Sequence, residues 1–279
     1  MGCGRTIAPH VAYFVGRFVI RIALGVEYNG QQFHGWQMQQ PGVRTVQAVL
    51  ESALTQVAAH PVRVVCAGRT DTGVHALGQV VHFDTSAQRS PRNWVLGVNA
   101  NVPDDVSVSW AKEVPTDFSA RFAATSRHYR YFILNRSTRS SLLAGRVTWV
   151  HKPLEVAAMQ EAAKALVGEH DFSSYRALAC QAKSPVRTVH SIHIERQGDM
   201  IVLHLHANAF LHHMVRNMAG VLISIGQGDQ PVSWAADVLA LRDRTQGGVT
   251  ARPDGLYFAQ VEYPASLGIP APTVEGFPA

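Results

Sequence analysis

Residues 18–28 read Phe18-Val-Ile-Arg-Ile-Ala-Leu-Gly-Val-Glu-Tyr28, with an apolar side chain at every second position from Phe18 to Val26. This period of two predicts a β-strand with one buried face. The turn signal Asn29-Gly30 ends the strand. Thr45 then offers a cap to a helix, because the apolar residues that follow it recur at helical spacing.

The elements that follow this strand and helix complete a recognisable order. Strands are expected at 62–66, 78–84 and 106–114, and a second helix is expected to begin at Pro91 behind the cap Ser90. The order is therefore β-α-β-β-α-β, which is the split βαβ or ferredoxin-like unit.

The second half of the chain has a decorated version of the same order. We expect strands at 120–135, 147–150, 188–196, 200–207 and 255–263, and helices at 153–167, 210–225 and 233–242. The predicted fold class is α+β, with two ferredoxin-like or RRM-like halves whose antiparallel sheets meet at a central basic cleft. The predicted division is an extension at 1–16, domains at 17–113 and 114–265, and a loose tail at 266–279.

Composition narrows the class of protein. The 279 residues are 47% hydrophobic and 16% charged, which is typical of a soluble globular protein. The net charge of +5 suggests a polyanionic partner. Three widely spaced cysteines and the lack of a membrane-length apolar run indicate a cytoplasmic protein. Residues 1–6 fit the loose N-myristoylation pattern, but an unstructured extension is the preferred interpretation.

The loop Gly68-Arg-Thr-Asp-Thr-Gly73 joins two apolar strands, so its tip reaches solvent or lines a cleft. One interpretation makes Asp71 the cap of a tight turn, as aspartate often is. The other interpretation is that Asp71 takes part in a reaction, because a hairpin has no need for arginine, threonine, aspartate and histidine within seven residues.

A basic segment between Phe118 and Leu154 suggests a nucleic-acid partner. It holds no Asp or Glu, and aromatic side chains alternate with its cations Arg121, Arg127, Arg130, Arg136, Arg139, Arg146 and Lys152. Arginines with aromatics suit phosphate binding and base stacking, although aromatics on a strand also pack into cores. Strand geometry places Tyr129 and Tyr131 on one face and His128 and Arg130 on the other.

Several motifs resemble the TruA family of tRNA pseudouridine synthases. These are Tyr28-Asn-Gly-x-x-Phe-x-Gly-Trp-Gln37, Gly68-Arg-Thr-Asp-Thr-Gly-Val-His-Ala76, Phe118-Ser-Ala-Arg-Phe122 with Arg127-His-Tyr-Arg-Tyr131, Phe210-Leu-His-His-Met-Val-Arg-Asn217, and Pro253-x-Gly-Leu-Tyr257. They occur in order over nearly the whole chain.

The resemblance implies the substrate and the roles of five residues. Asp71 would be the catalytic carboxylate and Arg216 its partner, Tyr129 would stack on the target uracil, Leu256 would pack on its far side, and Arg69 would contact the flipped nucleotide. It further implies a homodimer that isomerises uridine at positions 38, 39 and 40 of the tRNA anticodon stem-loop. Whether the carboxylate attacks C1′ or acts as a base on the sugar stays open.

Metal ions and cofactors are not expected. An isomerisation needs neither, and the chain has no P-loop or dinucleotide fingerprint. His204, His206, His212 and His213 raise the question of zinc, but no carboxylate or cysteine nearby in the sequence completes a ligand set. The remaining alternatives are a non-catalytic RNA-binding module or chaperone, and a carboxylate hydrolase unrelated to RNA, which lacks a second acid near Asp71.

Overall fold

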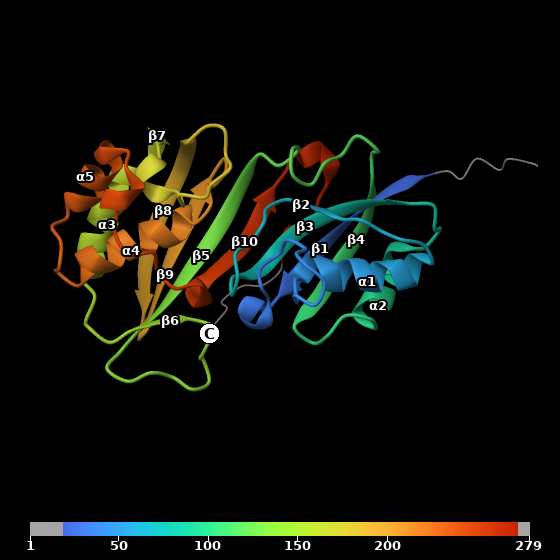
Figure 1. Cartoon of the computed structure of the whole chain (residues 1–279), viewed down its shortest axis with the longest axis horizontal. Coiled ribbons are helices and arrows are strands. Elements are labelled where there is room, and N and C mark those ends of the chain that lie inside the picture. Colours follow the sequence, from blue (N-terminus) through green and yellow to red (C-terminus); the bar gives the residue numbers. More distant parts are fainter. Residues whose placement is uncertain (1–18, 273–279) are drawn as a thin grey trace, which may run out of the picture.

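The computed structural model describes residues 19–272, which form an α+β fold (Figure 1). Within these residues a mixed, largely antiparallel sheet of ten strands is accompanied by five α-helices. No helix in this range is long and apolar enough to cross a membrane. The predicted extension at 1–16, with its acylation pattern, and the last part of the predicted tail, 273–279, lie outside the described residues.

The first half follows the predicted order closely. Its elements are β1 (Ile20–Tyr28), α1 (Val46–Ala58), β2 (Val65–Cys66), β3 (His75–Thr85), α2 (Pro91–Asn99) and β4 (Val106–Val114). Both predicted caps are present, because the Thr45 side chain accepts from the Ala48 N–H and the Ser90 side chain from the Asn93 N–H. Strand β1 lies between β3 and β4 and is antiparallel to both, and β2 pairs with the far end of β3.

The second half has more elements than expected. They are β5 (Ser126–Asn135), β6 (Thr148–Val150), α3 (Val156–Ala163), β7 (Gly168–Asp171), β8 (Val186–Gln197), β9 (Met200–Ala207), α4 (Met214–Gly226), α5 (Trp234–Leu241) and β10 (Leu256–Glu262). Strand β7 was not predicted, since its four polar or small residues show no strand pattern. Helix α4 begins four residues later than predicted, because His213 has a left-handed conformation, φ 62°.

The two halves share one continuous sheet, in the order β4-β1-β3-β10-β5-β9-β8-β7. The last strand within residues 19–272, β10, inserts between β3 and β5, as its red arrow between teal and green shows (Figure 1). It pairs parallel with the start of β3 and antiparallel with β5. The start of β3 follows the Asp71 loop directly, so this junction places the loop beside elements of the second half.

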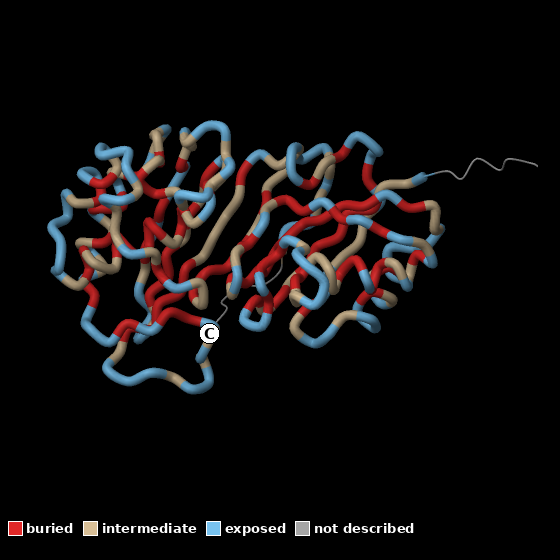
Figure 2. The backbone as a smooth tube through the Cα atoms, viewed as in Figure 1, coloured by how far each residue is buried: buried red, intermediate tan, exposed pale blue. Residues whose placement is uncertain are grey.

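Each half has its own large hydrophobic core. The first gathers α1, α2 and one face of β1, β3 and β4, and the second gathers α3, α4 and α5 with one face of β5, β8 and β9 (Figure 2). Strand β10 serves both, because Leu256 belongs to the second core and Phe258 to the first. A smaller cluster around Phe132 and Tyr257 covers the opposite face at the centre of the sheet.

The segment 265–272 differs from the expectation of a loose tail. The Lys112 ammonium donates hydrogen bonds to the carbonyls of Leu267 and Gly268, at 2.8 and 2.7 Å. Leu267 and Ile269 pack against the first core. Two backbone carbonyls and two apolar side chains therefore hold this segment, although its composition is that of a loop.

Candidate active site

The Asp71 loop runs from the end of β2 to the start of β3 and is held by buried contacts. The Thr70 hydroxyl is hydrogen-bonded to the Tyr28 hydroxyl at 2.7 Å, and the Thr70 carbonyl accepts from the Trp36 N–H at 3.0 Å. Gly73 has φ 79°, a backbone conformation that glycine adopts without strain. These contacts fix the loop on both sides of Asp71 and leave its side chain, 22% exposed, free to face α4.

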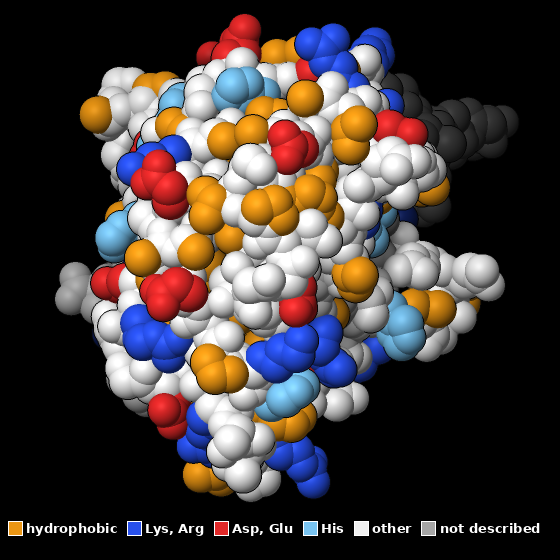
Figure 3. Space-filling model, turned by 90° about the vertical axis from the view of Figure 1, so that its left-hand side faces the viewer, with side chains coloured by type: hydrophobic (Ala, Val, Ile, Leu, Met, Phe, Trp, Pro, Cys, Tyr) orange, Lys and Arg blue, Asp and Glu red, His pale blue; other side chains and the backbone are white. Residues whose placement is uncertain are grey.

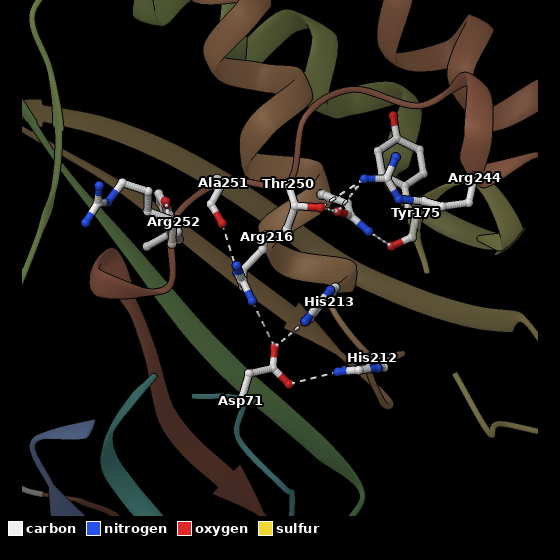
Figure 4. Close-up of polar contacts among 11 residues, drawn as sticks. Asp71, Tyr175, His212, His213, Arg216, Arg244, Thr250, Ala251 and Arg252 are labelled. Carbon is white, nitrogen blue, oxygen red and sulfur yellow. Dashed lines mark hydrogen bonds and ion pairs between the residues drawn. The ribbon is translucent and has the colours of Figure 1, made fainter. Parts of the chain in front are cut away.

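Three nitrogen atoms, two from the turn before α4 and one from its first turn, surround the Asp71 carboxylate (Figure 4). His212 Nε2 lies 3.2 Å from Oδ1, while His213 Nε2 and Arg216 Nη1 each lie 3.4 Å from Oδ2. Of these nitrogens, Arg216 Nη1 donates a hydrogen bond to Oδ2, which helps to fix the orientation of the carboxylate. Residues 145 positions apart in the sequence thus form one polar group.

Arg216 is placed by the backbone as well as by Asp71. Its side chain is 14% exposed, and its Nε donates to the Ala251 carbonyl at 2.9 Å. The Ala251 N–H donates in return to the Arg216 carbonyl at 3.1 Å. The charge in this apolar helix therefore has the partner that the sequence analysis expected, and a second one that it did not.

The two histidines beside Asp71 were not predicted as site residues. They are brought to the carboxylate by the turn before α4, which the sequence analysis took for helix. Burial lowers the pKa of His213, and the Arg216 charge acts in the same direction against the opposing effect of Asp71. The sequence did contain one indication that His212 belongs to the site, because it lies four residues before Arg216.

Tyr129 lies between the two cores, next to Asp71. Its ring makes edge-on contacts with Phe210, at 4.9 Å between centroids, and with Phe258, at 5.0 Å. Burial, and then the Asp71 charge, raise the pKa of Tyr129, so the phenol is neutral at physiological pH. Tyr131, two residues on, is fully buried and donates to the Arg252 carbonyl at 2.8 Å, as suits a structural residue.

The other two predicted residues lie in contrasting surroundings. Leu256 is 5% exposed at the start of β10 and belongs to the second core. Arg69 is exposed, and within residues 19–272 it makes no hydrogen bond or ion pair. The structure therefore brings Asp71 and Arg216 into contact, places Tyr129 beside them, and leaves Arg69 accessible to a ligand.

Comparisons with known proteins identify the family. A family model described as tRNA pseudouridine synthase matches residues 25–123 and 162–264. This chain belongs to the tRNA pseudouridine synthase family. The synthase is 55% identical to tRNA pseudouridine synthase A of Pseudomonas aeruginosa over 95% of this chain and 93% of that protein. It is 60% identical to the protein of the same name from Nitrosococcus oceani, over 90% and 96% of the two chains.

The similarity to solved structures is low. One, titled as a Cbf5-Nop10-Gar1 complex, aligns with 72% of the synthase and 45% of its own chain, at 12% identity and a TM-score of 0.32. A likeness this low carries no argument about fold or function.

Some cations of the basic segment bind other parts of the synthase, and others are exposed without an ion pair among the described residues. Arg127 is committed to the protein, since it donates to the carbonyls of Arg121 and Asn208 at 2.7 and 2.8 Å. Arg136 and Lys152 face Asp199 and Asp229. Exposed cations without an ion pair among the described residues are Arg121, Arg139 and Arg146.

One end of the synthase carries side chains of both charge signs. Acidic, basic and hydrophobic side chains are interspersed at the end formed by α3 and α5 (Figure 3). This end therefore lacks the single-sign field that attracts a polyanion.

The histidines singled out in the sequence do not form one cluster. His204 pairs with Glu195 at 3.1 Å, while His206 joins His128 and Glu262, and His212 and His213 join Asp71. The expectation that no carboxylate joins these histidines was wrong, because Asp71 and Glu262 reach them only through the tertiary structure. Both groups of three present ligand atoms within 4.8 Å of one another.

Proposed function

We propose that this tRNA pseudouridine synthase isomerises uridine to pseudouridine at positions 38, 39 and 40 of the anticodon stem-loop, with Asp71 as its catalytic carboxylate. The observation that carries the proposal is the ring of three nitrogen atoms around Asp71. A carboxylate that only capped a turn would have its own loop as partner. This one is turned across the junction of the two halves.

Arg216 orients Asp71 for reaction. Pseudouridine formation breaks the C1′–N1 bond, rotates the uracil and joins C1′ to C5. An ionised carboxylate serves either as the nucleophile at C1′ or as the base that removes a proton from the sugar. In both cases Arg216, itself held by the Ala251 carbonyl at 2.9 Å, directs the carboxylate oxygen atoms.

The residues around Asp71 bind different parts of the nucleotide. A uridine stacked in RNA must first be flipped out, which costs a few kcal/mol. Arg69, exposed two residues before Asp71, binds phosphate or fills the vacated position. Tyr129 presents its ring to the uracil, and Leu256, at the start of β10, packs from the other side.

The architecture supports a cleft between two related halves. Strand order β4-β1-β3-β2 in the first half corresponds to β10-β5-β9-β8 in the second, and both have the ferredoxin-like arrangement. Domain boundaries at 17–113 and 114–265 then place Asp71 in one half and Arg216 in the other. Such a junction is a natural binding site for a large ligand.

Two further properties belong to the proposal. The synthase acts in the cytoplasm, and it works as a homodimer that spreads one tRNA over two copies. A mass measurement in solution tests the second property.

Substitution of Asp71 tests the central assignment. Asp71→Asn keeps the shape of the side chain and removes its charge, so we expect tRNA binding to remain and pseudouridine in the anticodon arm to disappear. Asp105→Asn is a matched control, because Asp105 is also bound by an arginine, Arg44 at 2.8 Å, and makes no ion pair with Arg216, His212 or His213. Mapped pseudouridine at wild-type levels in the Asp71 variant would refute the role.

A further inference from the structure

A second group of side chains lies on the sheet face opposite Tyr129. His128 of β5 is paired in register with His206 of β9, and Glu262 of β10 is paired with Ser126. The residues that alternate with the two histidines, such as Tyr131 and Leu205, point into the second core. His128 and His206 therefore project from the other face, where three adjacent strands bring them together with Glu262.

The distances within this group fit a metal site. His128 Nε2 lies 2.8 Å from Glu262 Oε1, and His206 Nε2 lies 3.7 Å from Glu262 Oε2. The two imidazole rings are stacked, with centroids 4.0 Å apart and an interplanar angle of 11°. Their in-plane lone pairs therefore run nearly parallel, and one ring must turn about its Cβ–Cγ bond for both nitrogens to reach one ion. Zinc binds imidazole nitrogen and carboxylate oxygen at about 2.0–2.2 Å, which places ligand atoms roughly 3–4 Å apart.

Two features show a site that is built rather than a chance meeting of exposed groups. The Ser126 hydroxyl donates to Glu262 Oε2 at 2.5 Å, so an outer partner orients the carboxylate. His206 Nε2 is buried and has no hydrogen-bond partner within the described residues. A buried ring nitrogen without a partner is costly, and a cation would satisfy it.

The charge states also suit a cation. Burial is the main cause that lowers the pKa of His206, which favours the neutral imidazole that metals require. The Ser126 hydrogen bond is the main cause that lowers the pKa of Glu262, which favours the carboxylate. The group at Asp71 is different, since Arg216 already places a positive charge 3.4 Å from its carboxylate.

We propose that His128, His206 and Glu262 bind one divalent transition-metal ion of the zinc type, with water at the remaining position. The ion would tie together β5, β9 and β10 on the face opposite Asp71. Because β10 is the strand that joins the two halves of the sheet, bound metal would stabilise that junction.

The test is a ZnCl2 titration of the full chain after removal of metals with a chelator. We use a His212→Ala/His213→Ala background, which removes the histidines beside Asp71, and measure stoichiometry and affinity by calorimetry. We expect one zinc per chain, a Tm that rises with zinc, and loss of both effects when His206→Ala is added. Ser126→Ala should weaken binding by about 10–100-fold, as loss of an outer partner does.

His204→Ala is the matched control, because His204 lies two residues away on the same strand and faces a glutamate at 3.1 Å. We expect it to bind zinc like the background. Circular dichroism checks that each variant is folded, and Glu262→Gln, which keeps the shape of the side chain, is a second route to the same loss. The proposal is overturned if folded His206→Ala and Glu262→Gln variants bind zinc like the background, or if His204→Ala loses it equally.

Discussion

Replacement of Arg216 tests how the structure prepares Asp71 for reaction. The guanidinium makes two contacts, with the Ala251 carbonyl at 2.9 Å and with Asp71 Oδ2 at 3.4 Å. Arg216→Met keeps an unbranched apolar stem in the helix and removes both. Arg216→Lys keeps the charge, but an ammonium group has no planar fork with which to hold both partners in this geometry.

The size of the effect follows from these contacts. A hydrogen bond to a charged group contributes about 1.5–3 kcal/mol. The 3.4 Å separation is long, Asp71 is 22% exposed, and the two histidines remain, so we take the lower end of that range, about 1.5–2 kcal/mol. At about 1.36 kcal/mol for each factor of ten, kcat should fall by roughly 10–30-fold in Arg216→Met. The unpartnered Ala251 carbonyl should also lower the free energy of unfolding by about 1–2 kcal/mol.

Single-turnover formation of pseudouridine at saturating enzyme measures the chemical step apart from tRNA binding. Arg196→Met is the control, because Arg196 also binds backbone and side-chain oxygens, of Leu154 and Asn135 at 2.9 and 2.8 Å, far from Asp71. We expect that variant to lose stability and keep its rate. A single-turnover rate in Arg216→Met within twofold of the wild type would show that the arginine does not act through Asp71.

Two further predictions concern the frame of the site. Burial lowers the pKa of His75 to about 4, and its Nδ1 accepts from the Gly30 N–H at 3.0 Å, so the folded protein holds the neutral ring. Because the unfolded chain binds that proton near pH 6.5, stability is full above this pH and should fall by roughly 2 kcal/mol by pH 5. Urea unfolding at pH 6.5 and pH 5 should show a smaller fall in the free energy of unfolding for His75→Asn, which keeps an acceptor but cannot titrate. An equal fall in the variant and the wild type would exclude His75 as the source of this pH dependence. Gly30→Ala should unfold the loop region or abolish activity, since its Cβ would lie 1.9 Å from the Val74 carbonyl oxygen; a Tm and rate equal to wild type would contradict this packing.

Local patterns in the sequence predict most elements of this fold. The caps Thr45 and Ser90 and the alternation in β1 and β4 are properties of neighbouring residues, so they can be read along the chain. The start of α4 could not be read in this way. His213 takes a left-handed conformation, which is uncommon for a residue other than glycine, although histidine adopts it more often than most.

The same division applies to the candidate site. The sequence by itself determined that Asp71 lies in a glycine-flanked loop, that Arg216 needs a partner, and that Tyr129 and His128 face opposite ways. Only the tertiary structure decided which groups meet, because β10 inserts between β3 and β5 and so joins segments more than a hundred residues apart. It placed His212 and His213 on Asp71, and His128 and His206 on Glu262. Charge and hydrogen-bonding needs are visible in a residue type, but the partner that meets them is set by sheet pairing over long distances in the chain.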